Sequence, residues 1–283
     1  MRFPELETPI ILGSCDLFVN EANIRKHYTK CVGAIVLKSA TREPTSGYPQ
    51  PHVALLNGGV LVASGMANPG IAEMCRLAKS LSDDIPIIGS VADPALAREF
   101  ARTGVKAVEL NLSCPHNPGG VVPAHCPETV SEAVEAARLG CHLPIFAKLT
   151  GWDCDIVETS KAAIYAGADA VVVSNLFPGT GYYTGLVKQT SEYRIGDCLV
   201  GHGHGGYTSR NFLAGVLFMI RRIKEKLNIP IIATGGCCAD ADALAQTYLS
   251  GVDAIETVSP LYLGQNLDMI YDEFIEWKEK NDI

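Results

Sequence analysis

The stretch ARTGVKAVELNLSCPHNPGG, residues 101–120, contains the unit from which the fold of this chain can be predicted. A helix-like segment ends at Gly104, and the apolar run of residues 106–112 has the composition of a buried strand. The chain then enters a polar loop rich in proline and glycine. The order helix, glycine, strand recurs in IYAGADAVVV (164–173) and YLSGVDAIETV (248–258), which predicts a repeated architecture of strands and helices.

Eight short apolar segments recur along the chain, with amphipathic segments between them. Their β-branched, nearly continuous apolar composition is typical of parallel strands buried on both faces. The predicted strands are residues 9–14, 33–39, 85–91, 106–112, 143–149, 169–175, 229–236 and 253–259. The clearest predicted helices are residues 71–82, 93–104, 127–140, 212–228 and 240–251. This alternation predicts an α/β fold, a (β/α)8 TIM barrel in a single domain of residues 1–283, with a doubly wound sheet as the alternative.

The composition limits the class of protein. The chain has 283 residues, of which 47% are hydrophobic, so it can bury the core of one large barrel. Its net charge of −8 argues against nucleic acid or an anionic membrane as a partner, because both attract clustered Lys and Arg. The N-terminus lacks the layout of a signal peptide, and glycines and Pro69 break the longest uncharged stretch, residues 53–72. We therefore expect a soluble, cytoplasmic protein.

The ten cysteines show no C-x-x-C spacing, and no His pair lies at zinc-finger spacing. We therefore expect mostly structural thiols, no metal site and no iron–sulfur cluster carried by this chain alone. Cys114 differs from the others because it lies on the polar loop after a strand. A thiol has a pKa of about 8.5 in water, close enough to neutrality for general acid–base catalysis.

In a (β/α)8 barrel, catalytic and binding residues gather where the strands end and the following loops begin. Polar residues and glycines of this chain concentrate at those positions, which predicts a functional rim there. The residues of this rim are Ser14, Cys15, Lys38, Ser39, Asn111, Ser113, Cys114, Lys148, Asn175, Gly235, Gly236 and Ser259.

Two lysines and two asparagines of the rim indicate what binds there. Lys38 and Lys148 end apolar strands, and a buried lysine needs an anionic partner or a shifted pKa. We expect an anion or an electron-rich ring beside them, the alternative being that both reach the solvent. The side-chain amides of Asn111 and Asn175 can hold a planar ring by paired donors and acceptors.

The glycine pair Gly235–Gly236 lies between a predicted strand and a predicted helix. Its backbone amides can approach a phosphate closely, and the helix N-terminus adds a favourable dipole. Barrels often bind a phosphate between the loops after strands seven and eight, so Ser259 can add a hydroxyl and an amide. The pattern favours a phosphate-bearing ligand.

The motifs of the rim resemble those of a known family. ELNLSCPHNPGG (109–120) resembles the strand-four loop of the class 1 dihydroorotate dehydrogenases, and its NLSCPH is also similar to the flavin domain of dihydropyrimidine dehydrogenases. LKSATREPTSGYPQPH (37–52) is similar to the segment after strand two in the same family. Later landmarks of the family match in order, namely SGMANPG (64–70), FAKLTG (146–151), GHGGYTS (203–209) and IIATGGCCADADAL (231–244). The resemblance covers nearly the whole chain.

This resemblance implies an FMN-dependent oxidoreductase that moves a hydride between C6 of a dihydropyrimidine and the flavin, most directly from dihydroorotate to form orotate. It implies that Cys114 is the base for the C5 proton and that Lys148 lies beside the flavin ring. The substrate-binding residues it implies are Lys38, Asn111, His116 and Asn175. The flavin-binding residues it implies are Ser14, Lys38, Ser39, Lys148, Gly206, Gly235, Gly236 and Ser259.

Several residues depart from the family pattern on the substrate side. Val62 and His116 stand where dihydroorotate dehydrogenases have asparagines, Tyr48 replaces another Asn, and His52 replaces an Arg. Losing a buried polar partner costs about 1–3 kcal/mol. We therefore expect the flavin site to be better preserved than the substrate site and orotate to bind more weakly than in relatives that keep both asparagines.

Three other functions remain open from the sequence. One is the same chemistry on another pyrimidine or cyclic amide, as in dihydropyrimidine dehydrogenase. A second is a non-redox barrel isomerase or lyase that binds a sugar phosphate. A third is a flavin-binding subunit that passes electrons to a partner without turnover of its own. The family resemblance also implies a small-molecule substrate and a homodimer, with a separate electron-transfer subunit as an option.

Overall fold

The computed structural model describes residues 2–56, 58–114, 122–184, 195–199 and 204–283. Eight parallel strands form a closed barrel, in the order β1-β14-β13-β8-β7-β6-β5-β2. The strands are β1 (Ile10–Leu12), β2 (Val32–Val36), β5 (Ile87–Val91), β6 (Ala107–Asn111), β7 (Ile145–Lys148), β8 (Ala170–Val173), β13 (Ile231–Thr234) and β14 (Ala254–Thr257). All eight predicted strands are confirmed, and the doubly wound sheet is excluded because the sheet closes on itself.

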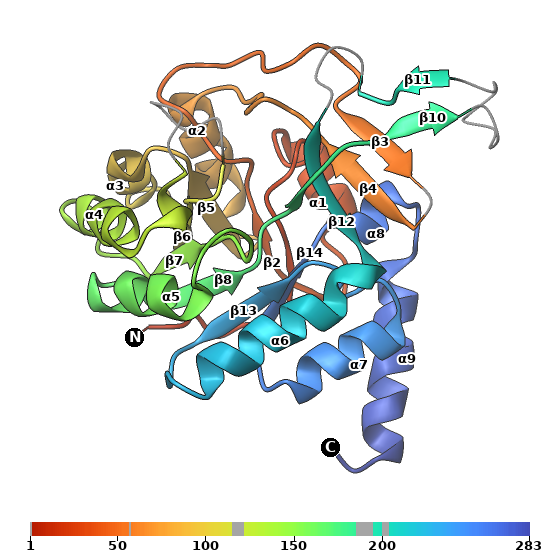
Figure 1. Cartoon of the computed structure of the whole chain (residues 1–283). Coiled ribbons are helices and arrows are strands. Elements are labelled where there is room, and N and C mark those ends of the chain that lie inside the picture. The colour runs from red at the N-terminus through yellow and green to blue at the C-terminus, as the bar shows by residue number, and fades with distance from the viewer. Residues whose placement is uncertain (1, 57, 115–121, 185–194, 200–203) are drawn as a thin grey trace.

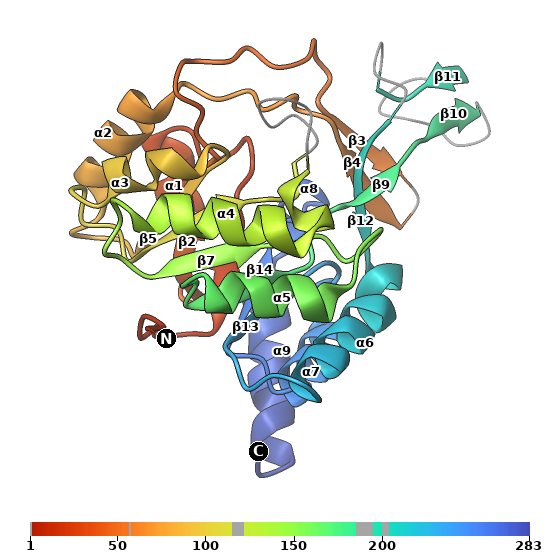
Figure 2. The ribbon, with the colours of Figure 1, turned by 60° about the vertical axis from the view of Figure 1, so that its left-hand side comes forward.

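Helices surround the barrel, as two views of the ribbon show (Figures 1 and 2). The helices are α1 (Glu21–His27), α2 (Ile71–Leu81), α3 (Ala97–Phe100), α4 (Pro127–Arg138), α5 (Ile156–Tyr165), α6 (Leu213–Lys224), α7 (Ala241–Leu249), α8 (Ser259–Tyr262) and α9 (Leu267–Lys280). Side-chain caps fix where several helices begin. The Asp155 carboxylate accepts from the Val157 amide at the start of α5, and Asp240 accepts from Ala243 at the start of α7.

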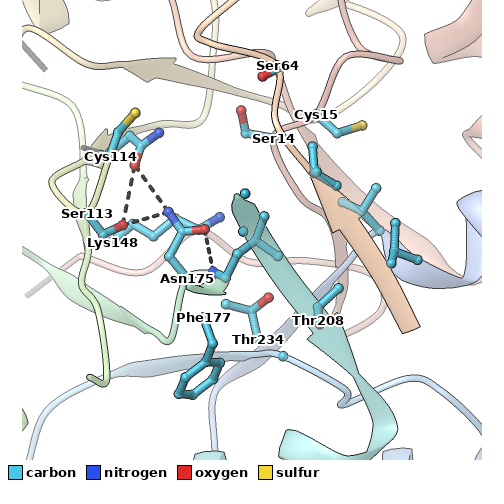
Figure 3. Close-up of a pocket in the computed structure, with 18 of the residues that line it drawn as sticks. Ser14, Cys15, Ser64, Ser113, Cys114, Lys148, Asn175, Phe177, Thr208 and Thr234 are labelled. Atoms are coloured by element: carbon cyan, nitrogen blue, oxygen red, sulfur yellow. Dashed lines mark hydrogen bonds between the residues drawn. The ribbon is translucent and has the colours of Figure 1, made fainter. Parts of the chain in front are cut away.

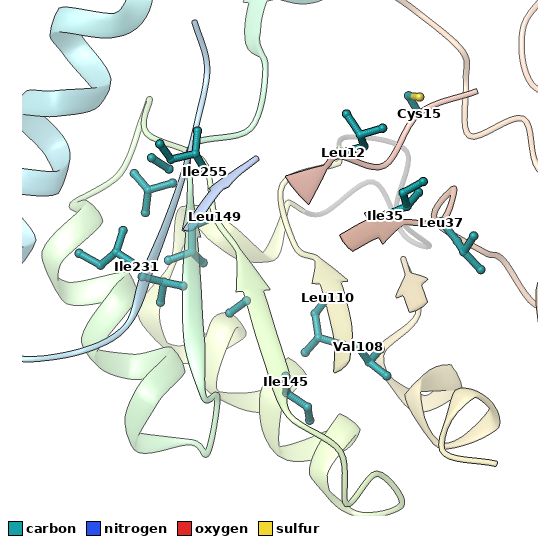
Figure 4. Close-up of a cluster of buried hydrophobic side chains, with 14 of the residues drawn as sticks. Leu12, Cys15, Ile35, Leu37, Val108, Leu110, Ile145, Leu149, Ile231 and Ile255 are labelled. Carbon is teal, nitrogen blue, oxygen red and sulfur yellow. The ribbon is translucent and has the colours of Figure 1, made fainter. Parts of the chain in front are cut away.

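The two faces of the barrel strands pack into separate apolar cores. Residues such as Leu12, Val108 and Ile255 point outward, into the large core between strands and helices (Figure 4). The alternate positions point inward, where a smaller core includes Phe146. Phe3 stacks on Phe146 with ring centroids 5.4 Å apart, so the N-terminal segment packs against this inner core. Successive residues of a strand face opposite sides of the sheet. A residue two positions along a strand from an inward-facing residue therefore also points into the barrel.

A four-stranded antiparallel sheet lies beyond the barrel rim (Figure 1) and was not predicted from the sequence. Its order is β3-β4-β12-β9, formed by β3 (Val53–Leu56), β4 (Gly59–Val62), β12 (Gly205–Ser209) and β9 (Phe177–Gly179). A two-stranded sheet pairs β10 (Tyr182–Thr184) with β11 (Ile195–Asp197). In the described part of the chain, no helix combines the length and the apolar character needed to cross a bilayer.

Candidate active site

A pocket of about 370 Å³ lies at the carboxyl ends of the barrel strands. This volume falls in the range of roughly 300–1,000 Å³ that is usual for small-molecule sites. The loops after the barrel strands form its floor and sides, and strands β4, β9 and β12 of the antiparallel sheet line it from beyond the rim (Figure 3). The additional sheet therefore closes the part of the rim that holds the predicted functional residues.

Three charged side chains lie at the floor of this pocket. They are Glu109 on β6, Lys148 on β7 and Glu256 on β14, and all three occupy inward-facing positions of their strands. Their exposed fractions are 1%, 6% and 2%. Lys148 Nζ donates to Glu256 Oε1 and lies 3.5 Å from Glu109 Oε1. The anion that a buried Lys148 requires is therefore supplied by the protein itself.

Burial controls the protonation of this group of three. Burial and the nearby charge of Glu256 raise the pKa of Glu109 well above its usual range, although Lys148 opposes the shift. Burial lowers the pKa of Lys148, but the two carboxyl groups raise it by more, so the pKa of Lys148 lies above its ordinary value. Lys148 is thus held as an ammonium ion.

Lys38 follows β2 at the other side of the pocket, and only 7% of it is exposed. Its ammonium donates to Asp16 Oδ1 at 2.6 Å and to Ser64 Oγ at 2.9 Å. His52 Nδ1 lies 3.2 Å from the other oxygen of Asp16. Both predicted lysines are therefore buried rather than turned to solvent, and each has a carboxylate of the chain as partner.

A line of hydroxyl groups joins the loops after the first strands. The hydroxyls of Ser14 and Ser39 lie 3.2 Å apart, and those of Ser39 and Ser90 lie 2.9 Å apart. Asn111 Nδ2 donates to Ser39 Oγ at 3.2 Å. The side-chain amide of Asn111 is thereby oriented by the Ser39 hydroxyl, which the hydroxyls of Ser14 and Ser90 hold in turn.

The two predicted ring-binding asparagines are in direct contact, because Asn175 Nδ2 donates to Asn111 Oδ1 at 3.3 Å. Asn175 Nδ2 also donates to Ser113 Oγ at 2.6 Å (Figure 3). The backbone amide of Leu176 donates to Asn175 Oδ1 at 2.8 Å. Asn111 and Asn175 therefore form one polar patch on the pocket wall, although β7 lies between their two strands.

Cys114 lines the same pocket and is 8% exposed, packed with Met66 and Ala92. Cys15 is a second buried thiol of the pocket, and burial raises the pKa of Cys15 to about 11. The predicted substrate residue His116 lies outside the described residues, as does the rest of 115–121.

Gly235 and Gly236 follow β13 with positive φ angles of 110° and 76°. A Cβ atom at Gly236 would lie 2.5 Å from the carbonyl oxygen of Ser209, so only glycine fits this turn. The predicted helix dipole is less available, because Asp240 caps α7 with its own carboxylate and pairs with Arg210 at 3.0 Å. The turn thus offers backbone amides rather than an open helix end.

All of the predicted site residues that the structure describes line this one pocket, including Gly206 on β12 and Ser259 at the start of α8. The sequence reasoning missed the carboxylates Asp16, Glu109 and Glu256. A signal existed for the last two, since each is an acid at an inward position of an otherwise apolar strand.

Sequence comparisons identify the family of this chain. A sequence model described as dihydroorotate dehydrogenase matches residues 4–273. The chain belongs to the dihydroorotate dehydrogenase family. Dihydroorotate dehydrogenase A (fumarate) of Lactiplantibacillus plantarum is 33% identical over 243 residues, which cover 82% of this chain and 76% of that protein. The catalytic subunit of dihydroorotate dehydrogenase B (NAD(+)) of Streptococcus pneumoniae is 31% identical over 265 residues, 89% of this chain and 82% of that protein.

Solved structures support the fold of this family member. A crystal structure of DHODH from Eimeria tenella in complex with ferulenol superposes with a TM-score of 0.76 at 16% identity, covering 98% of this chain and 82% of that chain. Ligand-free DHODH from the same organism gives 0.74 at 17% identity, with 97% and 85% covered. The (β/α)8 barrel and the family resemblance are both confirmed.

Proposed function

We propose that this chain oxidises dihydroorotate to orotate with FMN as its resident cofactor. The observation that carries the proposal is that the residues expected from the family motifs come from many different strands and loops and yet line one pocket. Two relatives named as dihydroorotate dehydrogenases, each over 30% identical, support the same reaction. The family match over residues 4–273 disfavours a non-redox isomerase or lyase.

The residues of the pocket fit FMN. The Gly235–Gly236 turn brings backbone amides close without a side chain, which suits a phosphate. Val60 and Val62 offer apolar surface to a flat ring, and Lys148 offers a cation at the floor. Bound FMN would supply the acceptor for the hydride that leaves C6 of the dihydropyrimidine.

The chain's own residues would bind the substrate and move its second hydrogen. Asn111 and Asn175 would hold the pyrimidine ring by their amides, kept in place by Ser39 and Ser113. The ammonium group of Lys38, which donates to Asp16, would also donate to an anionic substituent of the substrate. Cys114 would take the C5 proton as the general base, from a buried position that excludes bulk water.

The proposal extends to the setting of the enzyme. The Streptococcus relative is named as a catalytic subunit, which supports a separate electron-transfer partner for this chain. We also propose a homodimer, supported by the family resemblance alone, and a location in the cytoplasm, as expected from the sequence. Sedimentation of the purified protein would test the dimer.

The test begins with purified protein from which heat-released cofactor is identified by chromatography. We expect FMN, and a colourless protein that takes up no added FMN would contradict the proposal. Dihydroorotate should then bleach the flavin absorbance of the wild type. In Cys114→Ser the rate should fall by about two to four orders of magnitude with FMN still bound, because a hydroxyl is a far weaker general base.

Cys15→Ser is the matched control, because Cys15 lines the same pocket and its pKa of about 11 disfavours a thiolate at neutral pH. We expect this variant to keep a rate near that of the wild type. Equal losses in both variants would mean that the pocket was disturbed and that no specific base had been removed.

A further inference from the structure

The floor of the pocket contains more acid than base. Two carboxyl groups and one ammonium group share a space in which none is more than 6% exposed. If Glu109 and Glu256 were both ionised, the group would carry an uncompensated negative charge in a medium of low dielectric. Such a charge costs several kcal/mol, and proteins avoid it by binding a proton.

The contacts indicate where that proton resides. Lys148 donates to both carboxyl groups, but its bond to Glu256 is the close one, whereas the bond to Glu109 is long, at 3.5 Å. Within the described ranges, Oε2 of Glu109 is buried and has no hydrogen-bond partner. A carboxylate oxygen that receives no hydrogen bond is poorly stabilised as an ion, so the ionised form is disfavoured at Glu109. Burial raises the pKa of Glu109, and the charge of Glu256 and a hydrogen bond with Glu256 raise it further.

The backbone holds Glu256 in this arrangement. A Cβ atom at Gly13 would lie 2.5 Å from Glu256 Oε1 and 2.9 Å from its Cγ. The loop after β1 therefore packs directly against the carboxylate and leaves it little room to turn away from Lys148. The close approach of the Gly13 backbone to Glu256 therefore keeps Glu256 beside Lys148.

We propose that Glu109 and Glu256 together carry a single negative charge that compensates Lys148, with the spare proton on Glu109, and that this group sets the reduction equilibrium of the bound flavin. The proposal rests on the proposed function for the identity of the cofactor. Reduction adds negative charge to the flavin, so a lone ammonium ion at the floor would favour the reduced form strongly. A compensated ammonium ion favours it less. Glu109 and Glu256 are thus positioning residues that act through Lys148.

The proposal predicts a pattern of non-additive effects on the flavin potential. In Glu109→Gln, Glu256 still supplies the one negative charge, and in Glu256→Gln, Glu109 can release its proton and supply it. Each single variant should change the ratio of reduced to oxidised flavin by less than about threefold. The double variant leaves Lys148 without a counter-ion and should raise that ratio by about tenfold or more, which equals about 30 mV for a two-electron couple.

The experiment is a redox titration of the FMN-loaded proteins at mildly acidic pH, where Lys148 keeps its proton. Thr234→Val is the matched control, because Thr234 neighbours Glu256 in the barrel register and the change removes a hydroxyl without changing charge. Two single effects that add up in the double variant would show that both carboxyl groups are ionised, and would overturn the proposal. Equal potentials in all variants would show that the group does not act on the flavin.

A second measurement needs no cofactor and so separates this inference from the proposed function. The infrared spectrum of the cofactor-free wild type should contain the carbonyl stretch of a buried protonated carboxyl group. The band should be absent from Glu109→Gln and also from Glu256→Gln, where Glu109 becomes ionised. A wild type without the band, or a band that persists in Glu109→Gln, would overturn the proposal even if FMN binds as expected.

Discussion

Two buried lysines face the same pocket, and they differ in what balances their charge. Lys38 and Lys148 are almost equally buried, at 7% and 6% exposed. The carboxylate partner of Lys38, Asp16, keeps 24% of its side chain exposed. The partners of Lys148 are 1% and 2% exposed.

The difference shows that the exposure of the partner, more than that of the lysine, decides what a buried cation can do. Asp16 remains in contact with water, so its charge is stabilised even when Lys38 turns to another anion. Glu109 and Glu256 have no such access, so Lys148 stays bound to them. The Lys38 side of the pocket can therefore adapt to a substrate, while the Lys148 side presents a fixed charge.

The largest effect that would test this comparison is on stability. Lys148→Met leaves two buried carboxyl groups without a cation and should lower the free energy of unfolding by about 3–5 kcal/mol. Lys38→Met should cost only about 1 kcal/mol, because Asp16 stays hydrated. Urea denaturation of both variants measures the difference. Equal losses would show that the exposure of Asp16 does not matter.

The sequence predicts the barrel well because each of its strands is a local apolar segment followed by an amphipathic one. The sheet that covers the rim was missed because its pairing joins distant segments, with Val62 of β4 opposite Gly206 of β12. Such pairs leave no periodic signal in either segment. Residues 53–72 appeared only as an apolar stretch broken by glycines.

The same contrast holds within the site. The rim rule identified the lysines, asparagines and glycines, since each follows a recognisable strand. Glu109 and Glu256 could have been predicted from strand parity, which places both inside the barrel. Asp16 could not, because the direction of its side chain depends on the loop after β1, which carries no periodic pattern. The partner that makes Lys38 adaptable is therefore visible only in the structure.

The substrate side offers a second, smaller test. Val62 lines the pocket where the family pattern has an asparagine, and it can meet no polar group of orotate. Val62→Asn should tighten orotate binding by about one to two orders of magnitude, the equivalent of about 1–3 kcal/mol. The measurement is a titration of the oxidised enzyme with orotate, followed by the flavin spectrum.

Val62→Ala is the control for that titration, because it removes volume without adding an amide. If Val62→Asn binds orotate no better than the wild type, other groups of the pocket already form hydrogen bonds with the polar atoms of orotate. The interpretation of Val62 is then wrong. If Val62→Ala alone tightens binding, steric exclusion by Val62 is the cause.

The last test concerns the pH dependence of stability on the Lys148 side of the pocket. Burial and the charge of Glu256 raise the pKa of Glu109 in the folded protein above the ordinary value of 4.5. At a pH between the unfolded-state pKa and the folded-state pKa of Glu109, the folded state binds one proton more than the unfolded state, so stability falls as the pH rises. The contribution of Glu109 is fully present below about pH 4.5 and is lost as the pH rises through the folded-state pKa, with a slope of up to about 1.4 kcal/mol per pH unit. Glu109→Gln cannot titrate, so its unfolding free energy should decline less steeply with pH than that of the wild type.

Asp16→Asn serves as the comparison, because the change lies on the Lys38 side of the pocket and should leave the slope due to Glu109 in place. Parallel curves for the wild type and Glu109→Gln would mean that Glu109 is ionised in the folded protein, and the contrast between the two lysines would then rest on burial alone.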